Sequence, residues 1–333
     1  MRYVLRGSRY VLSLFRAGCL PVVVLAALLC VSPSRADDSP LTITPQESHT
    51  EAILMGLYFR TPQLGWTVGS GGTILKTIDG GKTWKKVISG TTATLSGIFF
   101  FDEKQGWAVG ANGTIRRSLD GGQTWHAQFV DTQASFYGLS FVSPREGWVV
   151  GGNGTILHTT DGGAHWGDQA SKTNAALYAV QFLTAQHGTA VGAVGAVLVT
   201  DDAGVTWTPQ EMQGAVTLFD VYFSDASTGW VVGNAGAIFQ STDGGHHWID
   251  RTLPCNRTCT KLTDLLRVRF TNPQTGWIVG ERGMVYRTID SGFTWTEQGA
   301  IAKASLFGLS FPDGTQGWAS GENGTIVRLS TSR

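Results

Sequence analysis

The sequence predicts an all-β protein folded as a seven-bladed β-propeller that is closed by an N-terminal strand. Three observations predict this fold. A Gly-Trp pair recurs about every 41 residues, each repeat holds four short strand-like segments, and glycine is abundant. Glycine supplies 44 of 333 residues, about 13%, whereas a typical share is about 7%. Many tight turns combined with regularly spaced aromatic residues are typical of a β-repeat protein.

Residues 1–36 have the pattern of a signal peptide. Four arginines precede the apolar run Leu20–Val31, and Ser34-Arg35-Ala36 offers small residues to a signal peptidase. The run is shorter than the roughly 20 residues needed to span a bilayer. We expect cleavage after Ala36 and export of residues 37–333 as one domain. An uncleaved signal anchor that holds the protein at the membrane is the alternative.

The exported part has a modest negative charge. The leader takes five of the 25 basic residues and none of the 25 acidic ones, which leaves 20 basic against 25 acidic residues. Only 15% of the residues are charged and 42% are hydrophobic, so the composition excludes a disordered chain. It also gives no reason to expect nucleic acid as a partner.

Two cysteines remain after the leader, Cys255 and Cys259, in the stretch LPCNRTCTK. An oxidising compartment permits a disulfide, which would staple a short loop. The spacing also suits a metal ligand pair, but no histidine or second cysteine pair lies nearby to complete four ligands. We favour the disulfide.

The repeat is defined by three positions. A phenylalanine stands six residues before each Gly-Trp glycine, and in six units an aspartate stands 14 residues after it, followed by a tryptophan five positions on. The glycines are Gly65, Gly106, Gly147, Gly188, Gly229, Gly276 and Gly317, with threonine replacing tryptophan after Gly188. The aspartates are Asp79, Asp120, Asp161, Asp202, Asp243 and Asp290. The units lie near 53–93, 94–134, 135–175, 176–216, 217–263, 264–304 and 305–333.

Each unit is predicted to form four antiparallel strands. In the second unit these are Leu95–Phe101, Gly106–Gly110, Thr114–Ser118 and Thr124–Phe129, joined by turns rich in Gly, Asn and Asp. The recurring aspartate falls on the turn between the third and fourth strands, where its carboxylate can accept bonds from turn amides. We therefore assign the six aspartates a structural role.

The seventh unit lacks an aspartate motif and a fourth strand. The segment 41–46 precedes the first complete unit, and we expect it to supply that strand and so remove the open edge of the ring.

Known catalytic signatures are absent from the sequence. The glycine-rich runs lack the lysine and helix of a phosphate-binding loop, the seven histidines show no metal spacing, and no nucleophile elbow or H-E-x-x-H is present. We expect no catalytic residues, no metal and no cofactor.

Charge departs from the average in the sixth unit. Seven basic residues lie between Arg251 and Arg287 against two acids, whereas Glu146–Asp250 holds ten acids and only Lys172. The basic sector is either a solvated face or a docking surface for an acidic partner, which we favour. Its candidate partner-binding residues are Arg251, Arg257, Arg267, Arg269 and Arg282. Asp220 and Arg267 occupy one repeat position in neighbouring units and are expected to pair.

Units of the form F-x5-GW-x-VG-x2-GTI-x3-T-x-DGG-x-TW resemble the photosystem II stability/assembly factor family of plants and cyanobacteria. The resemblance covers about Leu41 to Arg333. It implies a non-catalytic propeller that binds a membrane-protein complex or a precursor subunit, a reaction-centre subunit in a photosynthetic source. It also implies a location in the periplasm or thylakoid lumen, and an arginine patch for which Arg267, Arg269 and Arg282 are candidates. We expect a monomer.

Aspartate motifs of this kind also occur in sialidases, so a sialidase-like hydrolase or a carbohydrate-binding propeller is the alternative. A sialidase needs three converging arginines and a tyrosine–glutamate pair. Tyr58 and Tyr222 are the nearest candidate tyrosines, and neither has an obvious glutamate partner in the sequence.

Overall fold

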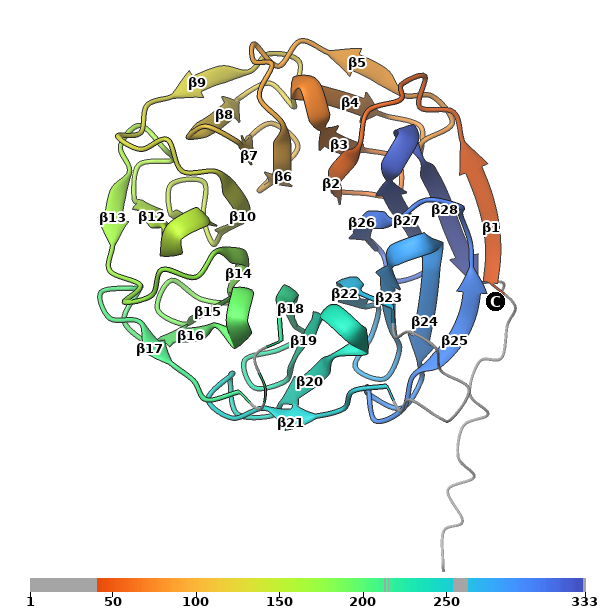
Figure 1. Ribbon diagram of the computed structural model, residues 1–333. Coiled ribbons are helices and arrows are strands. Elements are labelled where there is room, and N and C mark those ends of the chain that lie inside the picture. Colours follow the sequence, from red (N-terminus) through yellow and green to blue (C-terminus); the bar gives the residue numbers. More distant parts are fainter. Residues whose placement is uncertain (1–40, 213, 215, 254–262, 332–333) are drawn as a thin grey trace, which may run out of the picture. The chain divides into compact units, whose positions relative to one another are not determined.

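The computed structural model describes residues 41–331 except 213, 215 and 254–262, and it confirms the predicted propeller (Figure 1). Among the described residues, seven four-stranded antiparallel sheets form a ring, and their innermost strands are β2, β6, β10, β14, β18, β22 and β26. No helix in the described ranges is long and apolar enough to cross a membrane.

The first four blades follow the chain in order. Blade one holds β2 (Leu54–Phe59), β3 (Gly65–Gly69), β4 (Thr73–Thr77) and β5 (Lys85–Val87). Blade two holds β6 (Leu95–Phe100), β7 (Gly106–Gly110), β8 (Thr114–Ser118) and β9 (His126–Gln128). Blade three holds β10 (Phe136–Phe141), β11 (Gly147–Gly151), β12 (Ile156–Thr159) and β13 (Gly167–Gln169). Blade four holds β14 (Leu177–Phe182), β15 (Gly188–Gly192), β16 (Val197–Thr200) and β17 (Thr208–Pro209).

The remaining blades close the ring. Blade five holds β18 (Leu218–Phe223), β19 (Gly229–Gly233), β20 (Ile238–Ser241) and β21 (Ile249–Asp250). Blade six holds β22 (Leu265–Phe270), β23 (Gly276–Gly280), β24 (Met284–Thr288) and β25 (Thr296–Ala300). Blade seven holds β26 (Leu306–Ser310), β27 (Gln316–Gly321), β28 (Ile326–Thr331) and β1 (Leu41–Gln46). Six single-turn helices, η1–η6, join second to third strands at 70–72, 152–154, 193–195, 234–236, 281–283 and 322–324.

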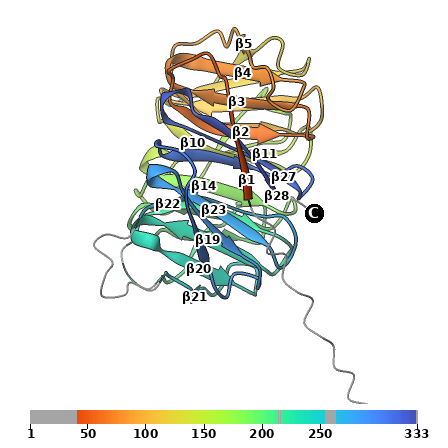
Figure 2. The ribbon, with the colours of Figure 1, turned by 90° about the vertical axis from the view of Figure 1, so that its right-hand side faces the viewer.

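The predicted closing strand is confirmed. β1 pairs antiparallel with β28 over six residues, from Leu41 opposite Thr331 to Gln46 opposite Ile326, and Figure 2 shows the two strands side by side. The side chain of Gln46 then reaches blade one, where its Nε2 donates to the carbonyl of Gly80 at 3.0 Å. The first strand therefore completes the last blade and joins it to the first.

In five of the described blades, the tryptophan of the Gly-Trp pair stacks on the repeat phenylalanine of the next blade. Trp66 is fully buried and stacks on Phe100 of blade two with ring centroids 3.6 Å apart, while its indole N–H donates to the carbonyl of Gly121 at 3.1 Å. Such stacked pairs contribute about 0.5–1.5 kcal/mol beyond their buried area. The same stacking recurs in the pairs Trp107–Phe141, Trp148–Phe182, Trp230–Phe270 and Trp318–Phe59.

The recurring aspartates shape the turns that receive these indoles. Asp79 accepts bonds from the Thr77 hydroxyl at 2.8 Å and from the Thr83 amide and hydroxyl at 2.9 and 2.6 Å. The side-chain and backbone bonds from Thr83 lower the pKa of Asp79 to about 2. The aspartates therefore act as fixed anions within turns on the outer side of the ring.

Blade four breaks the pattern. Thr189 stands where the other blades carry the tryptophan, and its buried hydroxyl has no hydrogen-bond partner among the described residues. His187 replaces the missing indole, because its Nε2 lies 2.8 Å from the carbonyl of Gly244, the counterpart of Gly121. The junction between blades four and five is therefore held by an imidazole instead of a buried indole.

Candidate binding site in the central cavity

The inner strands of all seven blades line a central cavity of about 490 Å³. One position on these strands stays small in five blades, where it is Gly56, Gly97, Gly138, Ala179 or Gly308. A Cβ at Gly97 would lie 2.8 Å from the Leu139 side chain, so the close approach of neighbouring strands favours a small residue there. Blades five and six place Asp220 and Arg267 at this position, and the cavity wall becomes charged.

Neighbouring inner strands are offset by one residue. An inward side chain in one blade accepts a bond from the backbone N–H one position further along the next strand, as Ser310 Oγ does from Phe59 at 3.0 Å. Ser140 and Gln181 accept from Phe182 and Phe223 in the same way, at 3.0 and 2.8 Å. Polar side chains thus link neighbouring inner strands of the cavity wall through hydrogen bonds.

Asp220 follows the same offset, so its ion-pair partner differs from the one expected. Its side chain is only 6% exposed, and its Oδ2 accepts from the Val268 amide at 3.0 Å and from Arg269 Nη1 at 2.6 Å. Arg267 instead donates to the carbonyl of Leu266 at 2.7 Å. The expected ion pair between Asp220 and Arg267 is wrong, because the one-residue offset brings the Asp220 carboxylate to Val268 and Arg269.

The cavity carries more positive than negative charge. Among the described lining residues, the charged ones are Arg60, Arg267 and Arg269 against Asp220 alone. Burial lowers the pKa of Arg267, an effect that the nearby Asp220 carboxylate opposes. Because Arg269 already neutralises Asp220, Arg267 and the exposed Arg60 remain to attract an anionic group.

Aromatic rings make up much of the remaining wall. Tyr58 lies against Phe99 with centroids 5.2 Å apart, and Tyr137 against Tyr178 at 5.3 Å. The guanidinium of Arg269 lies 5.6 Å from the ring centre of Tyr222. Rigid aromatic walls beside a few charges are typical of a site that binds a partner's side chains.

The other sequence candidates do not share this cavity. Arg251 follows the outer strand β21, where it bonds Gln240 at 3.1 Å and lies over the Phe293 ring. Arg282 is an exposed residue of η5, beside the start of β22, whereas Arg269 lies near the end of that strand. Arg257, Cys255 and Cys259 lie outside the described residues, as does the leader. Of the described arginine candidates, the structure brings together Arg267 and Arg269.

The catalytic group of a sialidase is not assembled by the described lining residues. No glutamate is among the described residues that line the cavity, so neither Tyr58 nor Tyr222 has the required partner there. Burial raises the pKa of both tyrosines, and the hydroxyl of Tyr222 donates to the carbonyl of Phe270 at 3.2 Å. Both effects oppose formation of a phenolate nucleophile.

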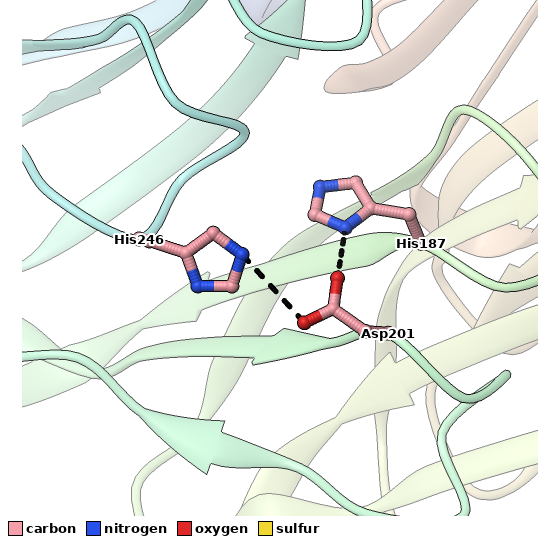
Figure 3. A group of neighbouring side chains, drawn as sticks. All are labelled: His187, Asp201 and His246. Carbon is pink, nitrogen blue, oxygen red and sulfur yellow. Dashed lines mark hydrogen bonds and ion pairs between the residues drawn. The ribbon is translucent and has the colours of Figure 1, made fainter.

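A second group of side chains lies on the outer part of the ring, between blades four and five. His187, Asp201 and His246 come from three different turns and converge, with their ligand atoms within 4.8 Å of one another (Figure 3). Sequence spacing does not predict this group, because its residues are separated by 14 and 45 positions and follow no metal-binding pattern.

One protein family matches this chain both in its sequence model and in solved structures. A family model described as photosynthesis system II assembly factor YCF48 matches residues 82–213 and 208–299. Among solved structures, YCF48 bound to D1 peptide is 21% identical with a TM-score of 0.73, covering 89% of this chain and 98% of that one. YCF48 from Cyanidioschyzon merolae is 20% identical with a TM-score of 0.71, covering 86% and 98%.

Enzymes share the fold at lower identity. A GH74 xyloglucanase from Xanthomonas campestris is 14% identical with a TM-score of 0.71, and the match covers 86% of this chain and 53% of that one. No curated protein matches the chain. These structural likenesses show the propeller fold alone, whereas the family model spans more than half of the chain.

Proposed function

Because the chain belongs to the photosynthesis system II assembly factor YCF48 family, we propose that it is a non-catalytic assembly factor whose central cavity binds an acidic segment of a membrane-protein precursor. The observation that carries this proposal is the excess of arginine in an aromatic-lined cavity at the centre of the ring. A member of the same family, YCF48, has been solved with a D1 peptide bound, which supports a subunit segment as the ligand.

Charge and shape both favour an extended acidic segment. The cavity of about 490 Å³ accommodates a few side chains and excludes a folded domain. An acidic group that reaches Arg267 gains from low local dielectric, and Arg60 at the end of β2 can guide it there. In a photosynthetic source the segment would belong to a photosystem II-like reaction-centre subunit.

Export and a monomeric state complete the proposal. The charge and hydropathy pattern of residues 1–36 supports delivery across a membrane, to the periplasm or the thylakoid lumen, where precursor segments emerge. A propeller whose closing strand comes from its own chain needs no strand from a second copy to complete its last blade.

Charge reversal at Arg60 tests the docking site. Arg60 is exposed and makes no ion pair with a described residue, so Arg60→Glu changes the cavity charge without disturbing the wall. Lys85→Glu is the matched control, because it makes the same charge change on the exposed outer strand of the same blade. Each tagged protein is incubated with native membranes, cross-linked and analysed by mass spectrometry.

We expect the parent and Lys85→Glu to cross-link to the same membrane-protein precursor at an acidic segment, and Arg60→Glu to lose that cross-link. Equal recovery by both variants would show that the partner binds elsewhere. Absence of any specific membrane-protein cross-link from the parent, together with saturable glycan binding, would replace the assembly-factor proposal by the carbohydrate-binding alternative.

A further inference from the structure

We propose that His187, Asp201 and His246 bind one Zn²⁺ ion at the junction between blades four and five, with a fourth position open to water. His187 precedes β15, Asp201 follows β16, and His246 lies in the aspartate turn that follows β20 of the next blade (Figure 3). The site is separate from the central cavity, and its occupancy is independent of the proposed function.

The ligand atoms lie within 4.8 Å of one another, close enough for small side-chain rotations to bring them around one ion. Asp201 Oδ1 is 2.7 Å from Nδ1 of His187, and its Oδ2 is 3.6 Å from Nε2 of His246. Zinc bonds of about 2.0–2.1 Å place tetrahedral ligand atoms about 3.3 Å apart. Asp201 and His246 have side chains 64% and 41% exposed, so both can rotate to close around an ion.

A hydrogen bond orients His187 as a ligand. The carbonyl of Gly244 can only accept, so the ring nitrogen Nε2 that lies 2.8 Å away carries a proton. The other nitrogen, Nδ1, faces a carboxylate oxygen at 2.7 Å. Two acceptors at that distance need a cation between them, either a second proton or a metal ion. Metal-binding histidines characteristically donate their second N–H to such a carbonyl.

The ligand types and the negative charge around them favour zinc. Two imidazoles and one carboxylate suit zinc-class ions, whereas Ca²⁺ and Mg²⁺ prefer oxygen ligands alone. The region Glu146–Asp250 holds ten acidic residues and a single lysine, so its field attracts a divalent cation. His246 has no counterpart of this kind in the aspartate turn of blade three, where the residue before His165 is Ala164.

At this location the ion would stabilise the contact between blades four and five. This junction lacks the buried tryptophan, and His187 already replaces the missing indole as donor to the aspartate turn of blade five. An ion held by His187 and Asp201 on one side and by His246 on the other would cross-link two blades at the junction where Thr189 replaces the tryptophan of the Gly-Trp pair. Binding to the folded state alone stabilises it by mass action.

Calorimetric titration with ZnCl₂ tests the site, using the mature protein without a histidine tag after removal of metals by EDTA. His246→Gln removes one ligand and leaves the His187–Gly244 bond intact. His165→Gln is the matched control, because His165 is an exposed aspartate-turn histidine that pairs with Asp161 alone. Thermal unfolding without metal establishes that both variants are folded.

We expect one zinc ion per chain in the parent and in His165→Gln, and binding at least about tenfold weaker in His246→Gln. Zinc should also raise the melting temperature of the parent more than that of His246→Gln, because the parent holds all three ligands in its folded state. Equal zinc affinity in His246→Gln and the parent, or no saturable binding by the parent, would overturn the proposal.

Discussion

Removal of the Arg269 guanidinium should destabilise the propeller through Asp220. In Arg269→Met the carboxylate, which is 6% exposed in the parent, keeps its bond from the Val268 amide but loses the guanidinium at 2.6 Å. Breaking a buried ion pair by removing one partner costs about 3–5 kcal/mol. Because Arg269 itself is 30% exposed, water reduces the loss, and we expect about 3 kcal/mol.

The double variant Asp220→Asn/Arg269→Met separates lost charge pairing from lost packing. The neutral amide no longer needs a counter-ion, so most of the lost stability should return. The measurement is thermal unfolding followed by tryptophan fluorescence, where about 3 kcal/mol corresponds to a fall of roughly 6 °C for a chain of this size. A loss below about 1 kcal/mol in Arg269→Met, or a double variant as unstable as the single one, would refute the reasoning.

Three further predictions concern the ring. Gly122→Ala should lower the free energy of unfolding in urea by several kcal/mol, because the φ of Gly122 is +79° and a Cβ would lie 2.5 Å from a neighbouring indole nitrogen. Gly71→Ala should cost about 1 kcal/mol, because Gly71 has a φ of +63° but open space around it. Similar losses in the two variants would contradict this. Turn hydrogen bonds lower the pKa of Asp79 and Asp161 in the folded state. The stability that these carboxylates give is therefore present above their unfolded pKa near 3.9 and is lost as the pH falls toward 2. A urea midpoint that does not change between about pH 4.5 and 2.5 would exclude this contribution. Deletion of residues 41–46 should lower the melting temperature and expose the edge of β28, which should cause concentration-dependent association that light scattering can measure. A monomer of unchanged stability would show that the closing strand is dispensable.

The fold was predictable from the sequence because the same structural positions recur from blade to blade. The Gly-Trp pair, the phenylalanine and the aspartate recur at fixed spacings, and each corresponds to one contact in the structure. The missing fourth strand of unit seven pointed directly to residues 41–46. Agreement among seven copies replaced the evidence that an alignment would supply.

The contacts that distinguish one blade from another were less predictable. Position along a strand does not reveal the one-residue offset between neighbouring inner strands, which directs Asp220 to Arg269. Likewise, Arg251 and Arg282 are close to Arg267 in sequence, yet one follows an outer strand and the other lies in a turn at the start of β22. His187, Asp201 and His246 meet only because the ring brings the turns of two blades together.

The pairing of β1 with β28 also sets the order in which the molecule can be completed. Leu41 is made 290 positions before its partner Thr331, and at synthesis rates of about 5–20 residues per second the first strand waits roughly 15–60 s for its place in the sheet. Blades one to six can form as the chain lengthens, but the circle is joined only in the final step. A chain that ends before Ile326 lacks β28, so β1 has no strand to pair with and the ring stays open at blade seven.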